Sequence, residues 1–471
     1  MHIVECTLHR TDVRLRMPFR YGIATMTEGP VLFVRLQVEV HGRIWIGISS
    51  DLLPAKWFTK IPEQSIAEEV AGMLRVIRHA ASTGIGLEGS NVFEIWRQLY
   101  EAQMAWATQE GIPPLLANFG VSLVERALIE AAAKATGQPF SQLLLSNELG
   151  ARLDWLHPEL AGVEPGDFLG EPRPNVVLRH TVGLADPLAE SDITDAERLD
   201  DGLPQSLEAS IRAYGLRHFK IKVNGKLEAD LERVSRCAEI IARWAPADFA
   251  FSLDGNEQFE SIDQFRAFWD KAQGRLELCA FLDHLLFVEQ PLHRKVALEA
   301  DVAAAFRQWP NRPPVIIDES DGTPVDFRLA LDLGYAGTSH KNCKGIFKGA
   351  AHRCLIEWRR RKAGSAMLMM SGEDLCNTGP IALLQDLAVM AALGIESVER
   401  NGHHYHPGLS QFPEPIQASV LRLHPDLYHP SPSGWPTLRV EDGRLNLGSI
   451  NRAPFGVGFD LDCELFSRAS D

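Results

Sequence analysis

Apolar and polar positions alternate through most of the first 50 residues, which is the pattern of β-strands. Residues 31–40 and 44–47 are two such runs with a turn at 41–43 between them, and this spacing predicts a hairpin. From about residue 62 to residue 136 the apolar spacing becomes helical, with Ile66, Val70 and Met73 on one face. Strands followed by helices predict a small α+β domain over residues 1–150.

Short apolar runs then alternate with helical patterns along the second part of the chain. Residues 153–179 are rich in Pro and Gly, and we interpret them as the crossing between two domains. The expected strands are 180–184, 219–223, 249–254, 285–289, 315–318, 338–341, 366–370 and 397–399. The helices expected between them include 227–245, 295–306, 347–362 and 380–393. About eight βα units predict an α/β barrel over residues 175–402, and we expect residues 403–471 to pack back on the first domain.

Composition narrows the class of protein. The 471 residues carry 47 basic and 62 acidic side chains, a balance that argues against a nucleic acid or an anionic membrane as partner. The seven cysteines show no CxxC or Cys/His ligand spacing, which is typical of free thiols in a reducing compartment. No apolar run reaches transmembrane length, and no signal-type segment begins the chain. We therefore expect a cytoplasmic protein.

The run 219–223 is unusual because Lys220 and Lys222 share one face of a strand that helical sequence flanks on both sides. A strand of a parallel sheet is expected to be apolar throughout. An edge strand with solvated lysines would explain the pattern equally well. A buried pair would need negative partners.

Such partners stand at the ends of the following strands. Asp254, Glu289 and Asp318 each end one of three successive predicted strands, and the chemistry of such barrels lies at these strand ends. Each carboxylate alone could be an ordinary cap or loop residue. Three hard oxygen ligands at equivalent positions, with no Cys or His among them, predict a Mg²⁺ site rather than a zinc site.

A lysine beside such a site can act as an acid or a base. Lys220 and the metal would disfavour the charged form of Lys222, so that its neutral amine could remove a proton from the carbon next to a carboxylate. The metal and Lys220 would offset the charge of the resulting enediolate. Lys341 on the sixth strand could reach the other face of the same carbon, or it could be a surface lysine.

Together these residues resemble the enolase superfamily, in particular the mandelate racemase and muconate lactonizing enzyme family. The motifs that carry the resemblance are Lys220-x-Lys222, Asp254-Gly255-Asn256, Glu289-Gln290-Pro291, Asp318-Glu319-Ser320 and a lysine on the sixth strand. The resemblance implies a capping domain and a modified TIM-type (β/α)7β barrel, Mg²⁺ on Asp254, Glu289 and Asp318, and catalysis by Lys222, Lys220 and Lys341. With no His-Asp pair in place, the two-lysine lactonizing subgroup is the nearer one.

The sixth strand departs from the family pattern. It lacks the usual double glycine after residue 344, so Lys344 or His340 could be the operative group instead of Lys341. The His403–His406 cluster matches no family role. The resemblance also implies a homo-oligomer.

Substrate binding is expected in the capping loops and at the last strand ends. The candidates are Arg20, Tyr21, Asn256, Glu373, Asp374, His403 and the loop 51–58, and the partner they imply is a small carboxylate. His403 could equally be structural. Reprotonation by Lys341 would give a racemase or epimerase, and loss of a β-substituent would give a lyase such as an acid-sugar dehydratase or a cycloisomerase. A non-catalytic barrel that binds a metal or an anion is the third reading.

Overall fold

The N-terminal part of the chain is a capping unit in which three helices cover one face of an antiparallel sheet. The computed structural model describes residues 1–363 and 367–469. The sheet is built from β1 (His2–Tyr21), β2 (Ala24–Val40) and β3 (Arg43–Leu52), with the short β15 (Ser467–Arg468) at its edge. The helices are α1 (Ile66–Gly84), α2 (Val92–Gln109) and α3 (Pro114–Thr136), followed by the short α4 (Phe140–Leu145) and α5 (Leu153–Leu156).

Burial explains how the sheet and the helices pack. Alternate residues of β2, such as Val34, Leu36 and Val38, are fully buried, so one face of the strand forms the core. Where α3 crosses β3, the strand has Gly47, and a Cβ there would lie only 1.8 Å from the carbonyl oxygen of Ala127. Only glycine allows this close approach.

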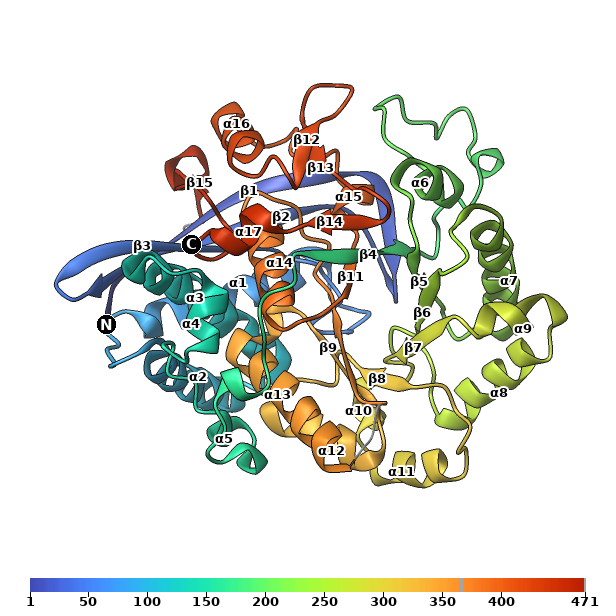
Figure 1. Cartoon of the computed structure of the whole chain (residues 1–471), viewed down its shortest axis with the longest axis horizontal. Coiled ribbons are helices and arrows are strands. Elements are labelled where there is room, and N and C mark those ends of the chain that lie inside the picture. Colours follow the sequence, from blue (N-terminus) through green and yellow to red (C-terminus); the bar gives the residue numbers. More distant parts are fainter. Residues whose placement is uncertain (364–366, 470–471) are drawn as a thin grey trace.

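The second part of the chain is a closed barrel of eight parallel strands (Figure 1). They are β4 (Asn175–Val182), β5 (His218–Lys222), β6 (Ala250–Asp254), β7 (Leu285–Glu289), β8 (Val315–Ile317), β9 (Gly337–His340), β10 (Met369–Gly372) and β11 (Ser397–Arg400). Pairing of β11 with β4 closes the ring, with Arg400 opposite His180. A capping domain followed by a TIM-type barrel confirms the predicted fold class.

Helices cover the outside of the barrel and connect successive strands. They are α6 (Leu207–Tyr214), α7 (Leu227–Trp244), α8 (Ile262–Gln273), α9 (Leu276–Leu282), α10 (Arg294–Ala297), α11 (Ala300–Arg307), α12 (Pro324–Leu333), α13 (Ile346–Ala363) and α14 (Ala382–Ala392). The helix expected at 295–306 is therefore two helices. Glu299 breaks it because its backbone is extended before α11 begins.

Three further expectations from the sequence were wrong in their bounds or in the type of element. The first barrel strand begins at Asn175 inside the supposed linker, because Arg179 interrupts the apolar pattern while its side chain pairs inside the barrel with Glu373. Arg20 and Tyr21, expected in a capping loop, lie instead at the end of β1, which shifts register against β2 between Arg14 and Phe19. The strand expected at 366–370 begins at Met369, and Ala366 lies outside the described residues.

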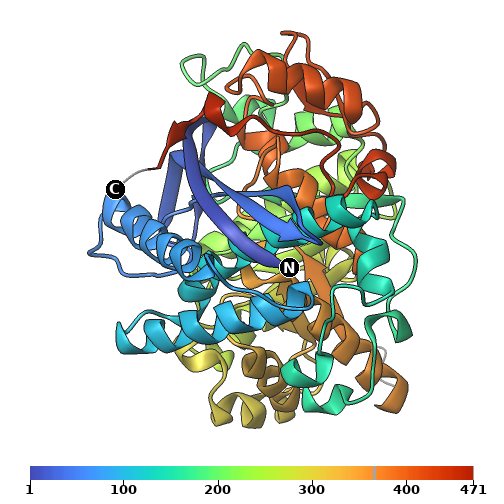
Figure 2. The same ribbon diagram turned by 90° about the vertical axis from the view of Figure 1, so that its left-hand side faces the viewer.

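The C-terminal segment joins both parts of the molecule. It contains α15 (Gly402–Tyr405), α16 (Glu414–Leu423), β12 (Tyr428–Pro430), β13 (Pro436–Leu438), β14 (Arg444–Asn446) and α17 (Gly448–Arg452). β14 pairs antiparallel with β4, and β15 pairs antiparallel with β1. In Figure 2 the strand β15, drawn in red, lies along the blue capping sheet.

All seven cysteines carry free thiols. Among the described residues, no helix has the length and apolar character needed to cross a membrane.

Candidate active site

Strand register brings the predicted residues of three neighbouring strands to one level of the barrel. Lys222 pairs with Asp254, and Asp254 pairs in turn with Glu289. All three are at least 95% buried, since their exposed fractions are 5%, 1% and 0%. Lys220 and Lys222 therefore do not lie on a solvated edge, because their strand is paired on both sides.

Lys220 lies at the centre of a ring of carboxylates. Its Nζ is 3.0 Å from Asp254 and 2.7 Å from Glu289. It is also 2.8 Å from both Glu373 and Glu399. Burial alone would lower the pKa of Lys220, but the four carboxylates raise it well above its ordinary value. Lys220 is therefore held as an ammonium ion.

Lys222 has a simpler environment. Its Nζ lies 2.5 Å from Asp254, and this is its only carboxylate contact within salt-bridge distance among the described residues. Asp254 also accepts hydrogen bonds from the backbone N–H of Asn256 at 2.9 Å and from the side-chain amide of Asn256 at 3.2 Å. The strand end thus fixes Asp254 between two lysines and an asparagine.

Three buried carboxylates are close enough together to hold one metal ion. One oxygen from each of Glu289, Asp318 and Glu373 lies within 4.8 Å of the others. Two of these residues were predicted as metal ligands, whereas Glu373 was predicted to bind substrate. Asp254, the remaining predicted ligand, is not a member of this group in the described part of the chain.

The electrostatics of this group suit a cation. Burial, together with the negative charges of Asp254 and Glu373, raises the pKa of Glu289 well above its ordinary value, so this position is short of positive charge. Hard carboxylate oxygens are the ligands that Mg²⁺ prefers. The residues present therefore fit Mg²⁺, the metal that the resemblance of the sequence motifs implies.

Asp318 is held in place from behind the cavity. Its backbone N–H donates to Oε1 of Gln290 at 2.7 Å, which connects the motif after β7 to the motif after β8. Lys344 Nζ lies 2.8 Å from Oδ1 of Asp318 and donates to the backbone oxygens of Asp318 and Ser339. Although burial opposes it, Lys341 and Lys344 hold the pKa of Asp318 well below its ordinary range.

The three candidate groups of the sixth barrel strand occupy different places. Lys341 lines the cavity, with its Nζ 2.7 Å from Asp318 and 5.2 Å from the ring centre of Trp57. Lys344 does not line this cavity and braces Asp318 instead. Nε2 of His340 donates to Oδ1 of Asn342 at 3.2 Å, and the ring of His340 lies against Gly349 of α13.

The cavity itself lies between the capping unit and the barrel mouth. The free space between its side chains is about 40 Å³. Its lining consists of Phe19, Tyr21, Met26, Pro54, Trp57, Lys220, Lys222, Asp254, Asn256, Asp318, Lys341, Asp374, Leu375, Cys376, Glu399 and Asn401. Among the substrate candidates, Tyr21, Asn256 and Asp374 are in this lining, while Arg20 has an exposed side chain.

His403 lies away from the cavity in a buried group of aromatic rings. Its Nε2 is 3.1 Å from Nδ1 of His180, and its ring packs against Tyr214. Burial, followed by the neighbouring His180, lowers the pKa of His403 well below its ordinary value, so the ring is neutral. This environment is that of a structural histidine.

Two residues of the ion-pair network were not found from the sequence. Arg179 donates to Glu373 at 3.0 Å, and Glu399 accepts from Lys220 at 2.8 Å. Arg179 is an isolated charge inside an apolar strand run, whereas Glu399 stands in the short polar strand Ser397–Arg400, and both side chains are buried inside the barrel. These charges are visible in the sequence, but the sequence does not show which residues they pair with.

A salt-bridge cluster connects the capping segment 54–60 to the barrel. Lys60 Nζ lies 2.6 Å from Glu257, and Arg294 donates to Glu257 at 2.8 Å from two of its nitrogens. Arg294 also donates to the backbone oxygens of Trp57 and Phe58. The cluster therefore fixes the wall of the cavity that carries Trp57.

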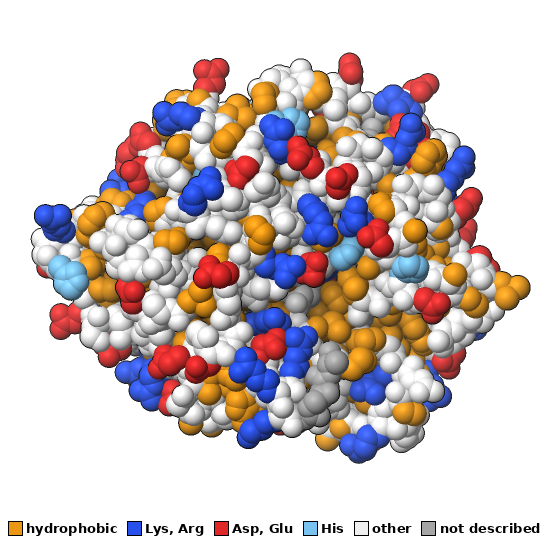
Figure 3. Space-filling model, viewed as in Figure 1, with side chains coloured by type: hydrophobic (Ala, Val, Ile, Leu, Met, Phe, Trp, Pro, Cys, Tyr) orange, Lys and Arg blue, Asp and Glu red, His pale blue; other side chains and the backbone are white. Residues whose placement is uncertain are grey.

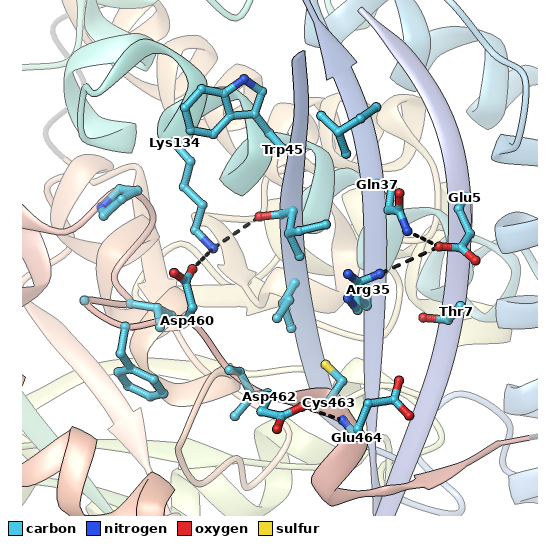
Figure 4. Close-up of a pocket in the computed structure, with 18 of the residues that line it drawn as sticks. Glu5, Thr7, Arg35, Gln37, Trp45, Lys134, Asp460, Asp462, Cys463 and Glu464 are labelled. Atoms are coloured by element: carbon cyan, nitrogen blue, oxygen red, sulfur yellow. Dashed lines mark hydrogen bonds and ion pairs between the residues drawn. The ribbon is translucent and has the colours of Figure 1, made fainter.

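A larger cavity, of about 900 Å³, lies on the outer face of the capping sheet (Figure 4). Its charged side chains pair with one another, as in Lys134 with Asp460 at 3.0 Å and Arg35 with Glu5 at 3.7 Å. None of the predicted site residues lines it. Size alone would favour this cavity, but the converging carboxylates and lysines place the candidate chemistry in the barrel mouth.

Comparison with known proteins agrees with this architecture. No family model matches the chain, and no curated protein matches it by sequence. Solved structures do match. A 2-chloromuconate cycloisomerase from Rhodococcus opacus 1CP superposes with a TM-score of 0.62 at 18% identity, over 99% of this chain and 100% of the other.

Two further structures are similar over almost the whole chain. A muconate lactonizing enzyme from Pseudomonas fluorescens, complexed with muconolactone, gives a TM-score of 0.60 at 18% identity over 98% of each chain. A dipeptide epimerase from Enterococcus faecalis V583, complexed with Mg and the dipeptide L-Leu-L-Tyr, gives 0.58 at 16% identity, over 96% of this chain and 98% of the other. The chain therefore has the fold of these solved enzymes, a capping domain joined to a modified TIM-type barrel, as its sequence motifs implied.

Proposed function

We propose that the protein is an enzyme that removes the α-proton of a carboxylate substrate and returns a proton to the same carbon, as a racemase or epimerase. The observation that carries this proposal is that Lys222 and Lys341, on different strands, both line one cavity beside a buried carboxylate cluster. Removal and return of a proton on opposite faces of a carbon require two such groups.

Glu289, Asp318 and Glu373 would hold Mg²⁺, with Asp254 beside them. The bound ion would stabilise the negative charge that develops on the substrate carboxylate. The motifs alone favour Asp254 as third ligand, whereas the distances favour Glu373, and metal affinity distinguishes the two.

The lysines differ in their charge environment, and this supports different roles. Lys220 contacts four carboxylates and serves as a fixed positive charge near the enediolate. Lys222 contacts one carboxylate, that of Asp254, and lines the cavity, and we assign it the role of the base. Lys341, held as an ammonium ion by Asp318 and Glu373, delivers a proton from its own side.

A lyase is the second candidate, because the fold of this chain is also that of two cycloisomerases over nearly their whole length. The first step would be the same. The two outcomes differ in whether the enediolate is reprotonated or loses a β-substituent, and product analysis by NMR separates them.

Exchange in D₂O tests the proposal. With Mg²⁺ and a panel of N-acyl amino acids, dipeptides and acid sugars, we expect deuterium to enter the α-position of at least one member. Lys222→Met should abolish this exchange for one stereoisomer, while Lys271→Met, a change at an exposed lysine, should leave it intact. Absence of exchange throughout the panel would instead favour a barrel that only binds a metal or an anion.

The proposed partner is a small carboxylate. On the face shown in Figure 3, basic and acidic side chains are interspersed, as expected of a protein that binds neither nucleic acid nor a membrane. A cytoplasmic homo-oligomer remains our expectation, and size-exclusion chromatography with light scattering would test the assembly.

A further inference from the structure

We infer that the substrate is a carboxylic acid with an uncharged, apolar far end and a neutral hydrogen-bonding group, such as an amide, near its α-carbon. This inference rests on the proposed function, because it concerns the same cavity. Three features of the lining carry it: its apolar wall, the pairing of its charges, and two asparagine side chains with unsatisfied oxygens.

Part of the lining is apolar. It consists of Phe19, Tyr21 and Met26 from the first two strands, Trp57 from the capping segment, whose ring centre lies 5.2 Å from Lys341 Nζ, and Leu375 of the barrel. The only hydroxyl among them, that of Tyr21, donates to the backbone oxygen of Ala55 at 2.8 Å. The ring of Tyr21 is therefore available for contact, but its polar atom is occupied.

Among the described residues, the charged side chains near these apolar residues are either paired or turned to solvent. Asp374 lines the cavity, but its carboxylate pairs with Arg400, which is fully buried. Arg20 is exposed to solvent, and the nearby Lys60 pairs with Glu257. A charged far end would be buried here without a partner, which is costly, whereas an apolar group would be favoured.

Two amide oxygens in the lining lack any hydrogen-bond partner. Asn256 and Asn401 are each 4% exposed, both line the cavity, and neither Oδ1 has a hydrogen-bond partner among the described residues. Buried polar atoms in native proteins are normally paired. An N–H or O–H of the substrate would pair them, and a substrate without any such group would leave them unsatisfied.

The test compares four acids in the α-proton exchange assay with the unmodified protein and Mg²⁺. N-acetyl-leucine carries the predicted features, N-acetyl-glutamate and Nα-acetyl-lysine add a charge at the far end, and gluconate replaces the apolar end by hydroxyls. We expect exchange of N-acetyl-leucine to exceed that of each of the others by about tenfold or more in kcat/KM, as expected when a site leaves a charge or polar group unpaired.

The outcomes separate the two proposals. Exchange of the charged acids or of gluconate at a rate equal to that of N-acetyl-leucine would overturn this inference and leave the proposed function standing. Exchange of none of the acids, and none in the wider panel, would overturn the function itself.

Two variant pairs add a readout that depends on the wall. Met26→Lys should shift the preference toward N-acetyl-glutamate, while Met26→Leu should not. Asn401→Leu should raise KM for N-acetyl-leucine more than Asn401→Gln does. An unchanged preference in a folded Met26→Lys protein, verified by circular dichroism, would contradict the inference, and the four-acid series decides it if that variant does not fold.

Discussion

Glu373 Oε2 accepts a hydrogen bond of 2.8 Å from Lys341 Nζ, and so connects the end of the seventh barrel strand to the sixth. The same oxygen accepts from Lys220 at 2.8 Å. Glu373 thus accepts hydrogen bonds from both Lys220 and Lys341. It also belongs to the carboxylate cluster with Glu289 and Asp318.

This position predicts that Glu373→Gln weakens Mg²⁺ binding by about tenfold or more, because one anionic ligand is lost. Titration calorimetry measures the effect without a substrate. Glu289→Gln should weaken binding in any arrangement and is the positive control. Loss of affinity in Asp254→Asn with none in Glu373→Gln would make Asp254 the third ligand.

Lys341→Met should remove proton delivery from one face of the substrate carbon. We expect racemisation to stop while exchange of one stereoisomer through Lys222 continues. Chiral chromatography combined with NMR in D₂O gives both readings. Equal loss of exchange from both stereoisomers would argue against roles on opposite faces.

Lys344→Met tests a positioning role, since Lys344 supports Asp318 without lining the cavity. Removing one partner of a buried ion pair leaves the other charge uncompensated, so we expect a loss of roughly 3 kcal/mol in the free energy of unfolding. Mg²⁺ affinity should fall as well. Lys344→Arg should recover part of both quantities, and a variant with unchanged metal affinity would speak against the role.

The salt-bridge cluster of Glu257 with Arg294 and Lys60, which connects the capping segment to the barrel, predicts a pH dependence of stability. Burial would raise the pKa of Glu257, but Arg294 and Lys60 lower it to about 2 from the ordinary 4.5. Because the folded pKa is the lower one, this contribution is complete above about pH 4.5 and is lost as the pH falls toward 2. It amounts to up to about 3 kcal/mol.

Urea denaturation at pH 6 and pH 3 checks this expectation. The unmodified protein should lose more stability between the two values than Glu257→Gln does. Equal losses would show that Glu257 does not carry the dependence.

Binding of Mg²⁺ should increase the affinity for a carboxylate substrate. Among the described residues, the buried network contains six acidic and six basic side chains, namely Asp254, Glu289, Asp318, Asp321, Glu373 and Glu399 with Arg179, Lys220, Lys222, Lys341, Lys344 and Lys348. A divalent cation adds positive charge to this balanced set, and a carboxylate ligand offsets it. Calorimetry should therefore show tighter carboxylate binding with Mg²⁺ than after chelation, and equal affinities would contradict the coupling.

Much of this site follows from sequence because each contribution is local. Asp254, Glu289 and Asp318 end apolar runs, and parallel strands bring their carboxyl ends to one edge of the barrel. The contacts of Glu373 and Arg179 could not be derived in this way, since they depend on which strands meet across the barrel and on side-chain direction. The separation of Lys341 from Lys344 likewise depends on the short turn after β9, which no periodicity encodes.

Strands β14 and β15 have a consequence for how the protein is made. β4 and β1, the first strands of the barrel and of the capping sheet, each receive a partner from residues 444–468. During synthesis β1 and the first residues of β4 therefore remain without these partners until residues 444–468 have left the ribosome. The barrel and its cover both depend on this late segment for their full strand pairing.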